Sequence, residues 1–503
     1  MSQPPSAPLH ISLDHSYARL PESFFVRQSP TPVPDPQLIC LNSDLAKKLG
    51  LDPDELQSPD GVAMLAGNAV PQGAEPIAQA YAGHQFGGFV PQLGDGRAIL
   101  LGEIIDPEGA RWDLQLKGSG RTPFSRGGDG KAALGPVLRE YILSEAMAAL
   151  GVPTTRALAA VTTGETVLRQ EGSLPGAIFT RIASSHIRVG TFQYFAARRD
   201  TDAVRQLADY TIARHYPEIL SSADPDQATT NSATPAVYAD FFKSVIAAQA
   251  ALIAQWMSLG FIHGVMNTDN TTISGETIDY GPCAFIDTFH PDCVFSSIDV
   301  NGRYSWGNQP NIGHWNLTRL AETLLPLLDE DPEIATQIAE AALNGYSENF
   351  NDHYMSRFRA KFCLSASPSS DLIIQEGLSL LGNQQIDFTL FFRHLTQMAA
   401  GGSEEPLTAL FSDAAPLNTW LDSWNVEADP AQYLAAMQQA NPILIPRNHR
   451  VEQTIQSAYT GDFQPFHRLT QALATPYTEQ VEYTDLEQAP TPEEIVHETF
   501  CGT

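Results

Sequence analysis

The 503-residue sequence predicts an α+β fold of two lobes, a small β-rich lobe followed by a large α-helical lobe, with extra helical segments at both ends. Strand-like, glycine-rich patterns concentrate before residue 195, and long apolar patterns of helical period follow it. Hydrophobic residues make up 43% and charged residues 17% of the chain, so most of it should fold. We expect four segments: an N-terminal extension wrapping the body (1–75), the β-rich lobe (76–195), the helical lobe (196–400) and an acidic helical region (401–503).

The N-terminal extension is rich in proline at residues 29–38, "SPTPVPDPQL", which favours an extended chain. A helix is expected after it, in "SDLAKKLGLD", with Ser43 as its N-terminal cap and Gly50 at its end. We interpret this segment as a lead-in that wraps the body.

The β-rich lobe should contain a hairpin, because "RAILLGEII" (97–105) and "RWDLQLKG" (111–118) flank the turn sequence "DPEG". Strand alternation places Lys117 on the polar face of the second strand. A helix expected at 136–150 would bring Glu140 or Glu145 near this lysine, with Glu140 favoured because it lies nearer the helix start. In kinases a strand lysine oriented by a helix glutamate binds phosphates. The alternative is a surface lysine with an incidental salt bridge.

Further strands and loops are expected over 154–195, followed by helices at 202–219, 235–260 and 315–347. A β-rich lobe that precedes a helical lobe is the order of a protein-kinase-like fold. Residues 261–281 follow the helix 235–260 directly, where the catalytic loop of such a fold belongs. The sequence therefore predicts a kinase-like bilobal arrangement.

The stretch "FIHGVMNTDNTTI" (261–273) has the frame of a kinase catalytic loop, and "DYG" follows it. Asn270 and Asp279, joined by a hairpin-like segment, could both ligate one magnesium ion. Val265 stands where a kinase has its catalytic base, and Asp269 is the nearest spare carboxylate. The alternative is a surface hairpin in which His263 is a hydrogen-bonded core residue.

The tract "KGSGRTPFSRGGDGK" (117–131) sets four cationic side chains among glycines, which is typical of an anion-binding loop. It is not a Walker A motif, since Ala132 replaces the Ser or Thr that would bind magnesium. "LGDGR" (93–97) could also approach a phosphate closely, and Arg181 and Arg188 are further phosphate candidates. Flexible loops and surface arginines are the alternatives.

The charge distribution argues against polyanionic partners. With 58 acidic and 29 basic side chains the net charge is −29, which repels nucleic acid and anionic membranes. No uninterrupted apolar run approaches the roughly 20 residues of a membrane helix, and the N-terminus lacks the pattern of a secretion signal. We expect a cytoplasmic protein, monomeric, without a nucleic-acid or membrane partner.

Five cysteines are too few and too scattered for a disulfide framework, and reduced thiols are the default expectation. One pairing is nonetheless open. Cys283 follows Asp279 by four residues, and Cys501 lies near the C-terminus, so a Cys283–Cys501 disulfide could lock the metal-binding segment under oxidising conditions.

The sequence contains the long motifs "SYARLPESFF", "LICLNSDLAKKLGLD", "YAGHQFGGFVPQLGDGRA", "DLQLKGSGRTPFSRGGDGKAAL", "HGVMNTDN" and "DYGPCAFID". Together they resemble the selenoprotein O family, from about residue 12 to the terminal Cys501. Animal members of that family end in a Cys-x-x-selenocysteine motif. Here position 498 is Glu, so no local redox pair can form at the C-terminus.

The resemblance implies a protein-kinase-like pseudokinase fold that binds ATP in a flipped orientation and transfers AMP to Ser, Thr or Tyr hydroxyls of proteins, or UMP from UTP. It implies Asp269 as the base, Lys117 and Glu140 as the ion pair, and Asn270 and Asp279 as ligands of Mg²⁺ or Mn²⁺. The nucleotide would be held by Lys117, Asp279 and Gly94, Gly96, Arg97, Asp129, Gly130, Arg181 and Arg188. The alternatives are a kinase acting on a protein or small molecule, and an inactive nucleotide-binding scaffold.

Overall fold

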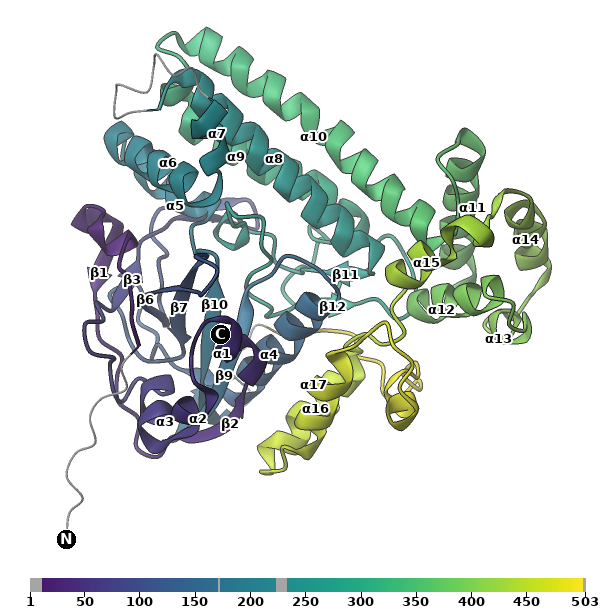
Figure 1. Cartoon of the computed structure of the whole chain (residues 1–503), viewed down its shortest axis with the longest axis horizontal. Coiled ribbons are helices and arrows are strands. Elements are labelled where there is room, and N and C mark those ends of the chain that lie inside the picture. The colour runs from purple at the N-terminus through teal and green to yellow at the C-terminus, as the bar shows by residue number, and fades with distance from the viewer. Residues whose placement is uncertain (1–10, 171, 223–232, 501–503) are drawn as a thin grey trace.

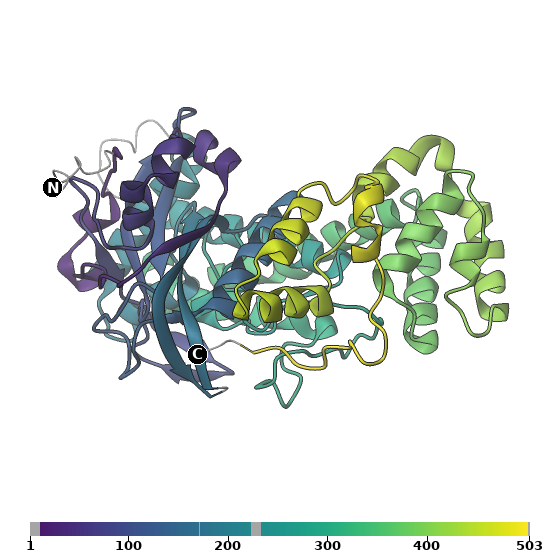
Figure 2. The same ribbon diagram turned by 90° about the horizontal axis from the view of Figure 1, so that it is seen from below.

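An antiparallel sheet forms one end of the molecule and helices form the other (Figures 1 and 2). The computed structural model describes residues 11–170, 172–222 and 233–500. This arrangement confirms the prediction of a β-rich part followed in sequence by a large helical part.

Within the described residues the main sheet has eight strands, and the N-terminal segment supplies both of its edges. β1 pairs with β3 at one edge, and β2 pairs with β9 at the other. The strands in spatial order are β1 (Phe25–Arg27), β3 (Ile77–Gln79), β6 (Ala98–Ile105), β7 (Arg111–Lys117), β10 (Gly172–Ala183), β9 (Arg156–Arg169) and β2 (Gln37–Leu41), with β8 (Ala132–Ala133) beside β10.

The predicted hairpin is present as β6 and β7, paired antiparallel. Asp106 shapes its turn by accepting hydrogen bonds from the N–H groups of Glu108 (3.0 Å) and Ala110 (2.8 Å). Gly109 has a φ of +88°, a backbone conformation that favours glycine. The turn sets the pairing of Ile105 with Arg111, and a bulge between Leu100 and Gly102 then shifts the register by one residue, which brings Lys117 opposite Ala98.

The helix after β2 is shifted by one residue from its prediction. α1 (Ser43–Lys48) is capped by Asn42, whose side chain accepts from the N–H of Leu45 at 3.0 Å, so Ser43 as the cap was wrong. Asn and Ser are comparable caps, and sequence alone does not choose between neighbours. Gly50 follows the helix with a φ of +76°, as expected of a helix end. Two short helices complete the segment: α2 (Pro53–Gln57) and α3 (Pro59–Leu65).

α4 (Leu134–Ala149) lies against β9 and β10 and buries nearly its whole length. Its other side is covered by two helices of the acidic C-terminal region, α16 (Asn448–Tyr459) and α17 (Gln464–Leu473), which share its apolar core. The C-terminal region therefore braces the helix that carries Glu140.

The helical part departs from the prediction at three places, and the first is that the helix expected at 202–219 is divided into α6 and α7. Residues expected as the last of the strands form α5 (Val189–Ala196), and the pattern at 315–347 is divided between two helices, α9 and α10. Asp331 caps α10 by accepting from the N–H of Glu333 at 2.9 Å. The other helices are α6 (Thr201–His215), α7 (Pro217–Ser222), α8 (Pro235–Ser258), α9 (Gln309–Leu328), α10 (Pro332–Lys361), α11 (Pro368–Gln384), α12 (Phe388–Ala399), α13 (Glu405–Thr408), α14 (Ala415–Glu427) and α15 (Pro430–Ala440).

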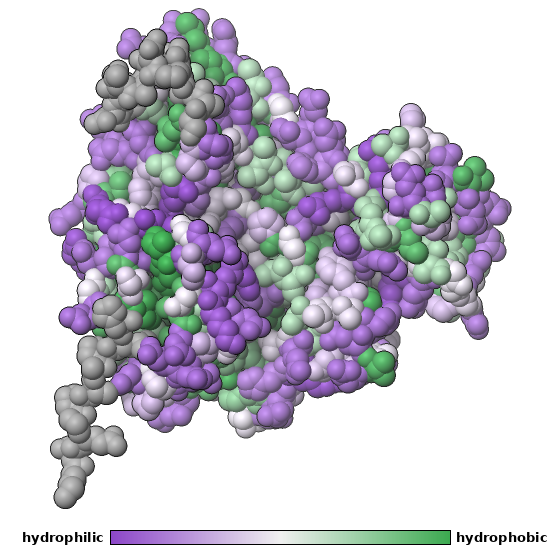
Figure 3. All heavy atoms as spheres, in the orientation of Figure 1, coloured by the Kyte–Doolittle hydropathy of each residue, from purple (hydrophilic) through white to green (hydrophobic). Residues whose placement is uncertain are grey.

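α8 is long and apolar enough to cross a membrane by composition, with a mean hydropathy of 1.4. However, 61% of the 18-residue apolar stretch of this helix is buried inside the protein. α8 packs along α9 and α10 as a core helix (Figure 1). The face seen in Figure 3 is mostly hydrophilic, with apolar side chains scattered over it. We therefore assign the apolar character of α8 to the protein core.

The segment that links Asn270 to Asp279 is not the expected hairpin. Asn270 ends a short 3₁₀ turn, η4 (Thr268–Asn270), and the following residues form isolated bridges with other segments. Thr272 bridges to Arg188 and Thr277 bridges to Thr154. The loop thereby connects the helical part to the end of β10. A small pair of strands, β11 (Phe261–Ile262) and β12 (Ala284–Phe285), closes its base.

Candidate active site

A cavity of about 890 Å³ opens between the sheet, α4 and the loop that follows α8. Its walls include twelve of the residues singled out from the sequence: Gly94, Gly96, Arg97, Lys117, Asp129, Gly130, Glu140, Arg181, Arg188, Asp269, Asn270 and Asp279. Segments that lie far apart in the chain thus meet in one place.

Lys117, at the end of β7, is held between two carboxylates. Its Nζ lies 2.5 Å from Glu140 Oε2 on α4 and 2.6 Å from Asp279 Oδ1. Glu145 lies elsewhere and binds Arg156 at 2.7 Å. Of the two glutamates left open by the sequence, Glu140 is therefore the partner of Lys117.

Two buried arginines join this pair. Arg181 on β10 contacts both Glu140 and Asp279 at 3.1 Å. Arg188 lies 3.5 Å from Asp279 Oδ2 and stacks over the ring of Tyr81 at 4.4 Å. Burial disfavours ionisation of Asp279, but Lys117, Arg181 and Arg188 outweigh it and hold the pKa of its carboxyl well below the usual value. Asp279 is therefore a carboxylate at any physiological pH.

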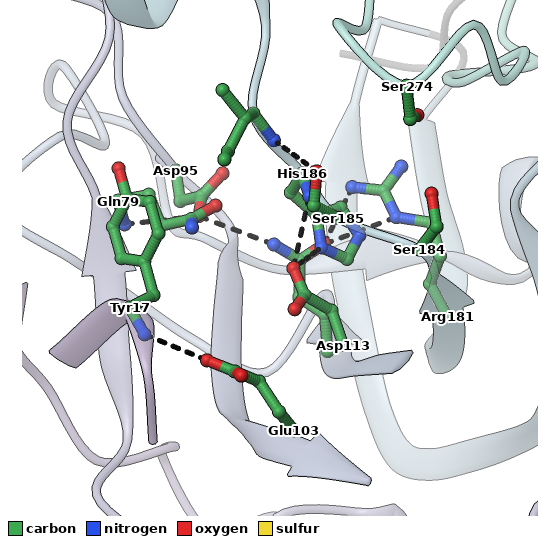
Figure 4. A network of polar contacts seen from close by, with 12 residues as sticks. Tyr17, Gln79, Asp95, Glu103, Asp113, Arg181, Ser184, Ser185, His186 and Ser274 are labelled. Atoms are coloured by element: carbon green, nitrogen blue, oxygen red, sulfur yellow. Dashed lines mark hydrogen bonds and ion pairs between the residues drawn. The ribbon is translucent and has the colours of Figure 1, made fainter. Parts of the chain in front are cut away.

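A buried polar network holds the turn that follows β10, where His186 lies beside Asp113 (Figure 4). Asp113 on β7 accepts from the backbone N–H of His186 at 3.0 Å and lies 2.8 Å from its Nδ1. Burial opposes the charge on Asp113, but Arg214 and His186 outweigh it and hold the pKa of its carboxyl below the usual value. The turn after β10 is thus tied to the sheet two residues before Arg188.

Asp269 is the second buried carboxylate of the cavity, with 7% of its surface exposed. Burial raises the pKa of its carboxyl to about 6, against the opposing effect of Arg188. Its Oδ2 accepts a hydrogen bond from Gln85 at 3.3 Å, while Oδ1 is buried and has no hydrogen-bond partner in the described part of the chain. A buried, unpaired carboxylate oxygen beside a cavity is available to accept a proton or a ligand.

His263 and Val265 have supporting positions in the loop. The ring of His263 is buried, and its Nε2 lies 2.9 Å from the carbonyl of Ile278. His263 is therefore a hydrogen-bonded core residue, which was one of the two alternatives left open by the sequence. The carbonyl of Val265 accepts from the side-chain amide of Asn270 at 3.1 Å. That bond uses the amide nitrogen and leaves the amide oxygen of Asn270 available toward the cavity.

Sequence reasoning missed a second hairpin, β4 (Gly83–Gln85) and β5 (Gly88–Val90), which lies on this loop. Its backbone N–H groups donate to the side chains of Thr268 (2.7 Å) and Asn267 (3.1 Å). A Cβ at Gly83 would stand 2.5 Å from Asp269 Oδ1, so only glycine allows this approach. The signal was present in "YAGHQFGGF", whose paired glycines mark a tight turn and a close backbone approach.

The basic glycine tract divides into separate roles. Asp129 and Lys131 are paired with Arg169 (2.9 Å) and Glu165 (2.8 Å), and Arg121 donates to carbonyls of its own loop. Arg97, from the "LGDGR" stretch, lines the cavity and forms no ion pair within the described residues. Gly94 and Gly96 lie so close to Phe124 that a Cβ at either would clash with it. The two glycine segments are therefore packed together at the cavity rim.

The cavity residues that could ligate a hard divalent cation are too few to hold it without further ligands. No group of three His, Cys, Asp or Glu side chains capable of holding a metal exists among the described residues. Asn270 and Asp279 offer oxygen ligands, and the remaining positions would go to nucleotide phosphates and water, as Mg²⁺ prefers.

Cys283 is buried next to Pro282, which lines the cavity, while Cys501 lies outside the described residues. The chain close to Cys501 does reach this region. The hydroxyl of Thr499 donates to the carbonyl of Pro282 at 2.6 Å.

Ammonium and guanidinium groups fixed by carboxylates around one cavity are typical of enzymes that transfer phosphate-containing groups. The comparisons with known proteins agree. Residues 8–474 match the family model described as protein adenylyltransferase SelO. The chain belongs to this family, and it is accordingly a nucleotidyltransferase.

Relatives named protein nucleotidyltransferase YdiU match almost the whole chain. The protein of Rhodopseudomonas palustris (strain BisB18) is 55% identical over 502 residues, which cover 98% of this chain and 100% of the relative. That of Rhizobium etli (strain CIAT 652) is 55% identical over 500 residues, covering 98% and 97%. That of Bradyrhizobium sp. (strain BTAi1) is 54% identical over 502 residues, covering 98% and 100%.

Proposed function

We propose that the protein transfers AMP from ATP to Ser, Thr or Tyr hydroxyls of other proteins, and that UTP can serve as a donor of UMP. The observation that carries this proposal is the junction of Lys117, Glu140, Arg181, Arg188 and Asp279 in one cavity of a SelO family member. A kinase-like bilobal arrangement belongs to the same proposal. A strand lysine paired with a helix glutamate, and a loop placed after a long helix, support it.

The cations are proposed to bind the triphosphate. Lys117 and Arg181 are pre-oriented by Glu140, so little side-chain entropy is lost when phosphate oxygens arrive. Arg97 has no competing carboxylate among the described residues and can pair with the nucleotide directly. Gly94, Gly96, Asp129 and Gly130 shape the rim on which the nucleotide lies.

Asp269 is proposed as the general base. Its carboxyl, with a pKa of about 6, is mostly ionised at neutral pH and can accept the proton of the attacking hydroxyl. The hydroxyl oxygen then bonds to the α-phosphorus, the bond from that phosphorus to the bridging oxygen breaks, and pyrophosphate leaves. Arg181 and Arg188 stabilise the charge that develops on the phosphates.

Asn270 and Asp279 are proposed to hold Mg²⁺ or Mn²⁺. A bound divalent ion would neutralise phosphate charge and orient the α-phosphate. Asp279 suits this role because its neighbouring cations keep it ionised.

Labelled ATP tests the reaction class. Transfer of the α-phosphate label to protein supports nucleotidyl transfer, transfer of the γ-phosphate label supports a kinase, and binding without labelling supports a scaffold. Asp279→Ala should abolish labelling, and undiminished transfer by that variant would overturn the metal assignment.

We propose a cytoplasmic monomer, and the net charge of −29 supports the absence of nucleic-acid and membrane partners.

We also propose a Cys283–Cys501 disulfide, which forms when an oxidant takes two electrons and two protons from the two thiols. The contact of Thr499 with Pro282 supports this pairing. Peptide mapping of the oxidised protein without reductant tests it, and the absence of a Cys283–Cys501 cross-link would refute it.

A further inference from the structure

A second pocket, of about 520 Å³, lies in the helical part where the ends of several helices meet. Three of its residues have basic side chains, and all three lie on one face of α10: His353, Arg357 and Lys361. At four-residue intervals they are spaced about 6 Å apart along the helix. Arg357 and Lys361 are like charges at this spacing, and such a pair destabilises a helix. Other contacts in the fold must therefore offset their repulsion.

The walls of this pocket contain no carboxylate in the described part of the chain. Lys361 lies at the base and is 2% exposed; its Nζ donates to the carbonyl of Ala440 at 3.3 Å and lies 4.1 Å from the ring centre of Phe392. Arg357 is half-buried, and one of its N–H groups donates to Gln255 at 2.9 Å. In a protein of net charge −29, one buried and one half-buried cation without an acidic partner among the described residues are unusual.

The helix ends around the pocket account for part of this arrangement. α4 ends at Ala149, α8 at Ser258, α10 at Lys361 and α15 at Ala440, so the carbonyl ends of four helices lie in this region. A helix end carries only about half a unit of negative charge, and it falls off within a turn. These partial charges are dispersed over several carbonyl groups, and the described residues place no full negative charge on the walls beside Arg357 and Lys361.

We propose that this pocket binds a small phosphate-bearing anion, either inorganic phosphate or a small phosphate monoester, through Arg357 and Lys361. A tetrahedral oxyanion accepts hydrogen bonds from several directions at once, which matches a guanidinium on the wall and an ammonium at the base. Leu150, Leu259 and Ala436 line the remaining wall and give room for a small apolar body. The volume lies within the usual range of small-molecule sites.

Burial lowers the pKa of the Lys361 ammonium to about 7, and no carboxylate of the described residues opposes the effect. A bound anion would compensate this desolvation. The pocket is separate from the candidate active site, since the two share no lining residue. Binding here is therefore measurable apart from nucleotide transfer.

The test is calorimetric titration of the full chain with inorganic phosphate and, separately, with glycerol phosphate, against potassium chloride of matched ionic strength. Arg357→Gln and Lys361→Met should each weaken phosphate binding about tenfold or more. Arg359→Gln is the matched control, because Arg359 is on the same helix but pairs with Asp371 outside the pocket. It should bind phosphate within about twofold of the unchanged protein.

Lys117→Met separates this pocket from the active-site cavity, and it should retain the binding that Arg357→Gln loses. Tighter binding of glycerol phosphate than of phosphate would identify a monoester as the ligand, and the reverse order would identify the free ion. Equal phosphate affinity in the unchanged protein, Arg357→Gln and Lys361→Met would overturn the proposal, as would no binding beyond the chloride control. If Lys361→Met does not fold, Arg357→Gln decides, since Arg357 is only half-buried.

Discussion

The protein encloses cations in two places, and the two differ in how those cations are compensated. In the active-site cavity Lys117 and Arg181 each contact Glu140 and Asp279 within about 3 Å. In the pocket along α10, Lys361 and Arg357 contact a carbonyl, aromatic rings and an amide, and no carboxylate of the described chain. Cations paired with carboxylates are held in place before a ligand arrives. Cations without a carboxylate partner among the described residues can pair with an anionic ligand directly.

The largest expected effect is a difference in AMP transfer between variants of Lys117 and of Lys361. Lys117→Met should lower AMP transfer by at least about a hundredfold, because it removes a pre-oriented charge from the triphosphate site. Transfer of label from α-labelled ATP measures this. Lys361→Met should keep transfer within a fewfold of the unchanged protein, and Lys243→Met, on the exposed surface of α8, is a second control. Loss of transfer in Lys361→Met as large as in Lys117→Met would break the distinction.

The same two substitutions should change stability in opposite directions. Lys117→Met leaves the buried Glu140 with one cation fewer, which should lower the free energy of unfolding by about 3 kcal/mol. Lys361→Met replaces a desolvated ammonium by an apolar side chain of similar length and should raise it by about 1 kcal/mol without phosphate. Urea unfolding followed by circular dichroism measures both. A decrease in both variants would show that Lys361 has structural compensation comparable to that of Lys117.

Among the carboxylates of the active-site cavity, Asp269 is oriented by a neutral side chain, since it accepts a hydrogen bond from Gln85. Gln85→Ala should lower the transfer rate about tenfold, through a less well oriented carboxylate, with little change in the apparent affinity for ATP. Separate determination of kcat and KM for ATP measures the split. Gln57→Ala, on exposed α2, should change neither value. A rise in KM with unchanged kcat would assign Gln85 to nucleotide binding instead.

The sequence predicted much of the fold where a pattern was local. The turn Asp106–Gly109, α4 and the order of the two parts follow from turn residues and apolar periodicity. Contacts between distant segments were less accessible. The residues from Gly83 to Gln85 were expected only as strand-like chain, because their contact with Asp269 depends on tertiary packing.

The site shows the same limit. Lys117, Glu140, Asp269 and Asp279 were named from the family resemblance and from spacing, and they do line one cavity. The pocket beside α10 was not predicted. Its cations are ordinary surface residues by composition, and only the folded chain shows that no carboxylate of the described residues faces them.

The smallest expected effect is a pH dependence confined to the pocket along α10. Lys361 has a pKa of about 7 in the folded protein and an ordinary value near 10.5 when unfolded, so between these values the unfolded chain binds more protons. Stability should therefore rise with pH, by about 1 kcal/mol from pH 7 to pH 8, until the unfolded lysine also loses its proton. His353 and Arg357 on α10 and Tyr477 opposite them face the same pocket, and Arg357 stays charged throughout. In urea unfolding in phosphate-free buffer, the change in stability between the two pH values should be about 1 kcal/mol more favourable in the unchanged protein than in Lys361→Met. This difference cancels the opposite contribution of buried Glu276, whose carboxyl has a pKa raised by burial to about 7 in both proteins. Saturating phosphate should reduce the difference, because a bound anion keeps Lys361 protonated in the folded state. An identical pH dependence in both proteins would mean that the ammonium of Lys361 is compensated in the pocket, as that of Lys117 is in the active-site cavity.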